Sequence, residues 1–129
     1  MVNIAKQIAY WRESAEEDWI VAGELLEKNR IRHTLFFGHL TLEKILKAHV
    51  CHATGELAPP IHNLVRLAEK AGIELTDKQL DLLADVNEFN IEGRYPDSRL
   101  APPNLEIATN YIMKIGEMRE CLSNLFLNP

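Results

Sequence analysis

The sequence predicts an all-α protein, an antiparallel up-and-down bundle of four to five helices. Apolar residues recur at spacings of three and four along almost the whole chain, and no segment alternates in the manner of a strand. The connections between these segments are mostly shorter than about ten residues, which favours antiparallel neighbours. The chain has 129 residues, of which 47% are hydrophobic and 26% charged. This length and composition allow one core, so we expect a single helical domain over residues 1–129.

The first helix is expected over roughly residues 3–29. Its apolar residues step by three or four and form one face: Ile4, Ile8, Trp11, Ala15, Trp19, Ala22 and Leu26. The other face carries five carboxylates: Glu13, Glu16, Glu17, Glu24 and Glu27. This division predicts a helix that packs on one side and meets water on the other.

The second helix is expected over roughly 32–54, ending at Gly55. Beyond Arg32 its full charges come only from Glu43, Lys44 and Lys47. The broad apolar face consists of Leu35, Gly38, Leu42, Ile45, Leu46, His49 and Val50, and Phe37 and Leu40 lie outside it. A helix that is apolar nearly all round must be covered on several sides. Either the centre of a bundle or the seam of a homodimer would cover it, and we expect a homodimer.

Three further helices complete the prediction. Gly72 closes the third, and Pro102 and Pro103 keep the connection before the fifth from being helical. The expected bounds are 62–71 for the third helix, Thr76 or Asp77 to Gly93 for the fourth, and 104–126 for the fifth.

Charge and composition exclude several classes of function. A net charge of -5 and a pI near 5.5 argue against broad binding to DNA, so we expect no DNA partner. No window of about 18 apolar residues exists, and the N-terminal segment turns acidic where a secretory leader needs apolar residues, so we expect no membrane contact. Two cysteines cannot form a disulfide framework and are expected to be reduced thiols in a cytoplasmic protein.

Neither a cofactor nor a metal is expected. The chain contains no Gly-rich phosphate loop, no G-x-S-x-G and no H-E-x-x-H. His49, Cys51 and His52 form an H-x-C-H cluster in which the two histidines have the i,i+3 spacing of shared ligands. A structural zinc site needs four ligands, and only His62 could approach this cluster in space.

The segment 90–97 is the first candidate binding site. Arg94, Tyr95 and Asp97 place a cation, a phenol and a carboxylate around the rigid Pro96, just past a predicted helix end. An arginine can fork onto phosphate or carboxylate, and a tyrosine can stack on a base. The alternative is a structural corner, in which the arginine caps a helix, the tyrosine packs on the bundle and the aspartate turns the chain.

A row of polar residues on the second helix is the other candidate. His39, Glu43 and Lys47 are spaced one turn apart along one edge of the apolar face. Glu43 could hold the second nitrogen of the His39 imidazole. The row therefore indicates a polar pocket at a helix or subunit seam. The alternative is a core histidine satisfied by a neighbouring helix, beside an ordinary i,i+4 pair of Glu43 and Lys47.

Four segments together resemble the HEPN domain family. These are the acidic first helix with its two tryptophans, HLTLEKILKAHV at 39–50, the H-N-L-x-x-L-A pattern at 62–68, and FNIEGRYPD at 89–97. The resemblance implies an all-α bundle, usually a homodimer, that binds a nucleotide. Prokaryotic members are commonly encoded beside a minimal nucleotidyltransferase, as apparent toxin–antitoxin or substrate-binding partners. The resemblance thus implies nucleotide or RNA binding and a nucleotidyltransferase partner.

The resemblance leaves the alternative of a metal-independent endoribonuclease that acts at a dimer cleft. Ribonuclease members carry an Arg followed after four to six residues by His on a late helix, and no His follows Arg94 in this way. Arg32 and His39 have the required spacing, but they lie at the start of the second helix. We therefore predict binding rather than catalysis and assign no catalytic residue. A third reading is a structural dimer that neutralises a nucleotidyltransferase by covering it.

Overall fold

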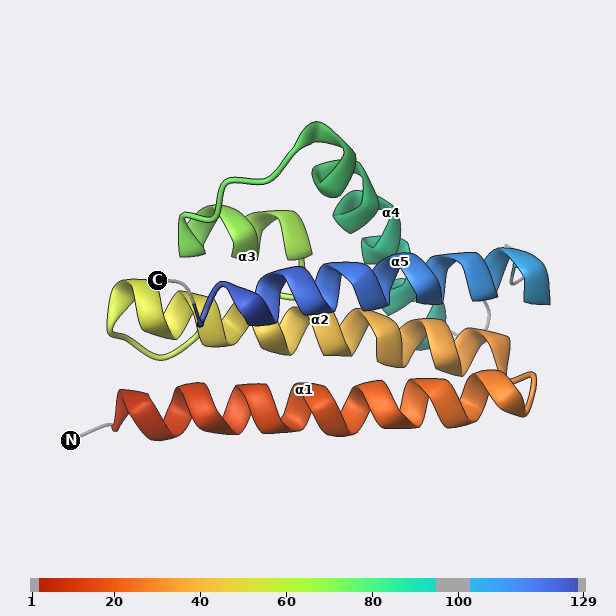
Figure 1. The fold of residues 1–129 in the computed structure, drawn as a ribbon, viewed down its shortest axis with the longest axis horizontal. Helices are drawn as coiled ribbons and strands as arrows, with labels where there is room; N and C mark the ends of the chain where they lie inside the picture. The colour runs from red at the N-terminus through yellow and green to blue at the C-terminus, as the bar shows by residue number, and fades with distance from the viewer. Residues whose placement is uncertain (1–2, 95–102, 128–129) are drawn as a thin grey trace.

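The computed structural model describes residues 3–94 and 103–127, with side chains described outside residues 91–94. These residues form five α-helices and contain no strand, which confirms the predicted all-α bundle (Figure 1). The helices are α1 (Ile4–Glu27), α2 (Ile31–Thr54), α3 (Leu64–Ala71), α4 (Asp77–Arg94) and α5 (Leu105–Asn124).

Helices α1 and α2 form a long antiparallel hairpin. The apolar stripe of α1 faces α2, and Ala15 and Ala22 in its middle are fully buried. The hydroxyl of Thr34 in α2 donates to the carbonyl oxygen of Ala22, close to the turn. Further along, Lys44 donates to the Ser14 hydroxyl at 2.7 Å and is paired with a carboxylate of α1. These contacts fix the register of the hairpin.

Helix α2 is the centre of the molecule. It packs against all four other helices, and fourteen of its residues are buried. The apolar circumference of α2 is therefore covered within a single chain, as the bundle-centre alternative predicts. The argument that α2 itself requires a dimer seam is wrong, because α1, α3, α4 and α5 supply the cover.

The direction of α5 differs from the one that a strict up-and-down alternation of five helices would give. Gly38 faces Ile112 and Ile115, and further along His49 bonds to the carbonyl oxygen of Leu122. Residue numbers thus rise together on both helices, so α5 runs parallel to α2 and antiparallel to α1 (Figure 1). The short helix α3 and the longer helix α4 lie between α2 and α5 in the chain, so that α5 can begin beside the start of α2.

Asparagine side chains set the starts of three helices. Asn3, Asn63 and Asn104 each accept a hydrogen bond from a backbone N–H in the first turn of α1, α3 and α5. At the other end of α2 and α3, Gly55 and Gly72 take the left-handed conformation, with φ of 69° and 68°. Because Asn63 is the cap, α3 begins two residues later than its predicted start at 62.

The end of α4 also differs from the prediction. The helix continues through Gly93 and includes Arg94, so Arg94 is its last residue rather than the first residue after it. A glycine inside a helix costs only about 1 kcal/mol relative to alanine, so Gly93 does not end α4. A residue that precedes proline disfavours the helical conformation, and Tyr95 precedes Pro96. The sequence therefore predicts a helix end before Pro96, and the described part of α4 does not end at Gly93.

Candidate functional site

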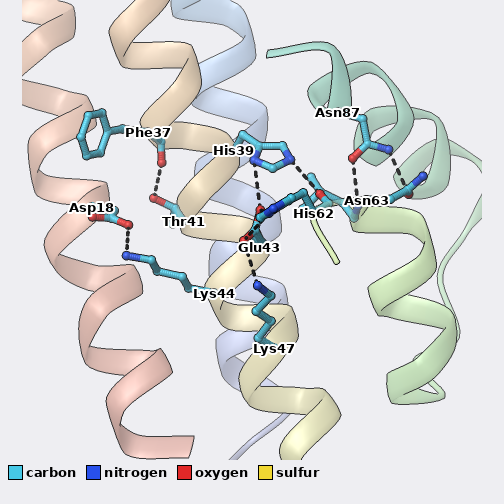
Figure 2. A network of polar contacts seen from close by, with 11 residues as sticks. Asp18, Phe37, His39, Thr41, Glu43, Lys44, Lys47, His62, Asn63 and Asn87 are labelled. Atoms are coloured by element: carbon cyan, nitrogen blue, oxygen red, sulfur yellow. Dashed lines mark hydrogen bonds and ion pairs between the residues drawn. The ribbon is translucent and has the colours of Figure 1, made fainter. Parts of the chain in front are cut away.

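Glu43 is the centre of a polar cluster in an otherwise apolar part of α2. Its side chain is 5% exposed, and three nitrogen-bearing side chains approach its carboxylate (Figure 2). His62 Nδ1 lies 3.1 Å from Oε1 and 3.2 Å from Oε2, and Lys47 Nζ lies 3.1 Å from Oε2. His39 Nδ1 is more distant, 3.6 Å from Oε1. We call His39, Glu43, Lys47 and His62 the Glu43 cluster.

Two residues of α2, one turn apart, contact different parts of His62, its side chain and its backbone. Glu43 contacts the His62 ring, while the fully buried His39 donates from Nε2 to the His62 backbone carbonyl at 3.0 Å. His62, which lies two positions before the first residue of α3, is thereby fixed in both its backbone and its side chain. His62 itself remains partly open to water, because 43% of its side chain is exposed.

Lys47 completes the charge balance of the cluster. Its side chain is 8% exposed, and its ammonium group lies 5.2 Å from the centre of the Trp11 ring of α1. A buried ammonium group is tolerated where a carboxylate and an aromatic face replace water. Lys47 therefore points inward, toward Glu43, and is not free to reach an outside anion.

The segment that carries His62 is also tied to α4. The Asn87 side chain accepts from the backbone N–H of Leu64 at 2.8 Å and donates to Asn63 Oδ1 at 3.2 Å (Figure 2). Asn63 in turn caps α3 by accepting from Arg66 N. His62 thus lies at a junction of α2, α3 and α4, where its position is determined from all three.

The sequence prediction found part of this cluster. His39, Glu43 and Lys47 do form a connected row, and the Glu43–Lys47 ion pair is the i,i+4 pair of the structural alternative. His39 donates from Nε2 to a backbone carbonyl just before α3. His62 was not predicted as a site residue. The sequence indicated His62 in two other ways, as the start of the H-N-L pattern and as a residue that could approach the H-x-C-H cluster.

The first candidate site falls mostly outside the described residues. Arg94 ends α4, but its side chain is not described, and Tyr95 and Asp97 lie outside the described residues. Their roles stay predictions.

The H-x-C-H cluster is occupied by contacts of its own. His49 Nε2 donates to the Leu122 carbonyl oxygen at 2.7 Å, and its ring stacks on Phe126 at 3.9 Å. Burial lowers the pKa of His49; the bond to Leu122 opposes this, and the charges of His52 and Arg12 add to the lowering. Burial also raises the pKa of the Cys51 thiol. Within the described ranges, no group of three or more His, Cys, Asp or Glu side chains is arranged to hold a metal ion.

Two hollows lie away from the Glu43 cluster. The first hollow, of about 540 Å³, lies between α1 and the C-terminal end of α5. Its lining includes Arg12, Glu16, Ile45 and Phe126. Another of about 420 Å³ lies between α4 and α5, where burial and the Asp85 carboxylate raise the pKa of the Tyr111 phenol. None of the helices described here combines the length and apolar character that crossing a bilayer needs.

The family comparison covers almost the whole helical region. The model of the HEPN domain matches residues 8–125, which span all of α2, α3, α4 and α5 and most of α1. The chain belongs to the HEPN domain family. No curated protein and no solved protein structure matches it.

In this HEPN domain, Arg32 lies in the first turn of α2 and His39 about two turns further along. This step of seven positions places the two Cα atoms about 10 Å apart along the axis of α2. His39 is fully buried, with Nε2 bonded to the His62 carbonyl oxygen. Within the Glu43 cluster, the imidazole that an outside molecule can reach is that of His62, which is partly exposed.

Proposed function

We propose that this HEPN domain binds a nucleotide, a minimal nucleotidyltransferase partner, or both, in a two-gene system of the toxin–antitoxin kind. The observation that carries the proposal is the exposed imidazole of His62, held rigidly by a buried carboxylate and a buried histidine. Interlocked polar groups beside an exposed edge are typical of binding sites.

The end of α4 supplies the second half of the proposed site. Arg94 would pair with an anionic group of the ligand or partner, and Tyr95 would stack or pack against it. Asp97 would fix the connection or bind a ribose hydroxyl. Asn87, which is tied to the His62 segment, lies seven residues before Arg94 on the same helix, or about 10 Å along its axis. A nucleotide is long enough to reach from one group to the other.

In this proposal His39, Glu43 and Lys47 line the site from behind. All three are buried, so they position His62 and do not themselves meet a large ligand. A homodimer is part of the proposal as well, and it rests on family membership and on exposed apolar side chains such as Tyr10, Ile20, Met113 and Leu127.

Replacement of Arg94 tests the proposal. Wild type and Arg94→Ala would be titrated with ATP, with a short RNA and with the neighbouring nucleotidyltransferase, and their thermal unfolding compared. Loss of a charge-assisted contact costs roughly 1.5–3 kcal/mol, or about one to two decades in affinity. Lys6→Ala, which removes one exposed positive charge from α1, is the matched control.

Two results would contradict the proposal. Arg94→Ala could lower the melting temperature sharply while every affinity stays level, which would make Arg94 a structural residue. RNA cleavage by the wild type that is lost in Arg32→Ala or His39→Ala would instead favour the endoribonuclease alternative.

A further inference from the structure

The contact between His62 and Glu43 determines which ring nitrogen carries the proton. A carboxylate can only accept hydrogen bonds, and Nδ1 lies within 3.2 Å of both of its oxygens. The neutral ring therefore holds its proton on Nδ1. Its other nitrogen, Nε2, then carries a lone pair and acts as a hydrogen-bond acceptor.

This acceptor is available at the surface. Nδ1 is engaged with Glu43, and within the described part of the chain the His62 ring makes no other hydrogen bond, while 43% of the side chain is exposed. The backbone of His62 cannot shift freely, because His39 holds its carbonyl oxygen. The molecule thus presents one acceptor atom at a fixed position.

The charge behind His62 disfavours a phosphate at this point. Behind the His62 ring, the Glu43 carboxylate and the Lys47 ammonium group pair with each other at 3.1 Å. They leave no net positive charge to attract an anion, and a lone pair on Nε2 repels phosphate oxygens. A hydroxyl or an amino group, which donates a proton to the lone pair, fits instead.

We propose that His62 Nε2 accepts a hydrogen bond from a donor group of the bound nucleotide, either a ribose hydroxyl or the exocyclic amine of the base. The proposal rests on nucleotide binding as proposed above. Glu43 and His39 are positioning residues for this contact, and Lys47 balances the charge of Glu43.

The first test measures the tautomer in the free protein. Long-range proton–nitrogen correlation spectra of ¹⁵N-labelled protein above neutral pH distinguish a protonated ring nitrogen from an unprotonated one. The His62 signals are assigned by their loss in His62→Asn. We expect the proton on Nδ1 in wild type. A proton on Nε2 would overturn the proposal whatever the ligand.

The second test measures the contact with the ligand. In His62→Asn the side-chain amide can still donate to Glu43, but no atom remains at the position of Nε2, so the support of Glu43 is kept. Calorimetric titrations would compare ATP with 2′-deoxy-ATP, 3′-deoxy-ATP and inosine triphosphate, which lacks the exocyclic amine. We expect one of these analogues to bind wild type about 3- to 10-fold more weakly than ATP, the effect of one neutral hydrogen bond.

The decisive comparison is between the two proteins. In His62→Asn the same analogue should bind as well as ATP does, because the acceptor is gone. His52→Asn, which changes another exposed histidine, should keep the wild-type discrimination. Equal affinities for ATP and every analogue in wild type would overturn this inference and leave nucleotide binding intact. No binding of any nucleotide would overturn both the inference and nucleotide binding.

Discussion

At the scale of single residues, three histidines differ in chemistry because of where they lie. His39 and His49 are on α2, and His62 lies just before α3. His39 and His49 both donate from Nε2 to a backbone carbonyl oxygen and are buried. His62 is the one whose ring combines a carboxylate partner with substantial exposure. The first two hold segments of backbone, whereas the third has an atom left for a ligand.

His49 makes the stability of the fold depend on pH. Burial, followed by the charges of His52 and Arg12, lowers its pKa below the ordinary value of 6.5, against the opposing effect of the Leu122 bond. The folded protein therefore binds a proton less readily than the unfolded chain does. The stabilisation is complete above about pH 6.5 and is lost as the pH falls through the lower pKa of the folded state.

The variant His49→Gln isolates this effect. Its amide can still donate to Leu122 but does not titrate, so its free energy of unfolding should fall less than that of wild type between neutral pH and about pH 5. Urea unfolding at both pH values measures the difference. His33→Gln, at an exposed position, is the control and should behave like wild type. A parallel loss in wild type and His49→Gln would show that other groups cause the acid sensitivity.

Individual residues also show which part of the site could be predicted from the sequence. The spacing of His39, Glu43 and Lys47 is enough to place them along one edge of a helix, and the structure connects them through Glu43. His62 is nineteen residues from Glu43. Helical periodicity says nothing about where the connection before α3 returns to α2, so this contact needed the three-dimensional structure.

At the scale of elements, α3 depends on its junction with α4. The Leu64 N–H belongs to a fully buried residue and donates to the Asn87 side chain at 2.8 Å. In Asn87→Ala this donor loses its partner, which costs roughly 1–3 kcal/mol. We expect the amides of α3 to lose protection from hydrogen exchange before those of α1 and α2.

The loss of a hydrogen bond to a backbone N–H in another helix serves as the control. Asn104→Ala removes the cap of α5, with a cost of about 1 kcal/mol, but it leaves the His62 segment untouched. In this variant, faster hydrogen exchange should be confined to the backbone amides of the first turn of α5. If Asn87→Ala leaves the exchange of α3 unchanged, the Asn87 contact does not hold this helix in place.

The elements themselves were predicted well where amphipathic periodicity is strong. The stripe of α1 and the all-round burial of α2 follow from the spacing of their apolar residues. The predicted boundaries failed at Asn63 and Gly93, where one polar cap and one tolerated glycine decide the outcome. The parallel direction of α5 and α2 depends on the two helices between them and is not encoded in either helix alone.

At the scale of the whole molecule, the covering of α2 within one chain changes the basis of the homodimer prediction. Other apolar groups remain exposed, including Ile20 at 62% and Leu127 at 72%. As a member of the HEPN family, the chain is expected to use such groups for self-association. Sedimentation at micromolar concentration should give about twice the 14.7 kDa of one chain. A clean monomer at that concentration would contradict the homodimer and leave the Glu43 cluster intact.

The central claim is that the ligand binds where α2, α3 and α4 meet, and chemical-shift mapping with ATP tests it most directly. Backbone amide signals of the ¹⁵N-labelled protein would be followed during the titration. The largest saturable shifts should fall at His62, at Asn63 and Leu64, at Asn87 and toward the end of α4. Shifts concentrated instead around Arg12, Glu16 and Phe126, at the hollow of about 540 Å³, would contradict the claim.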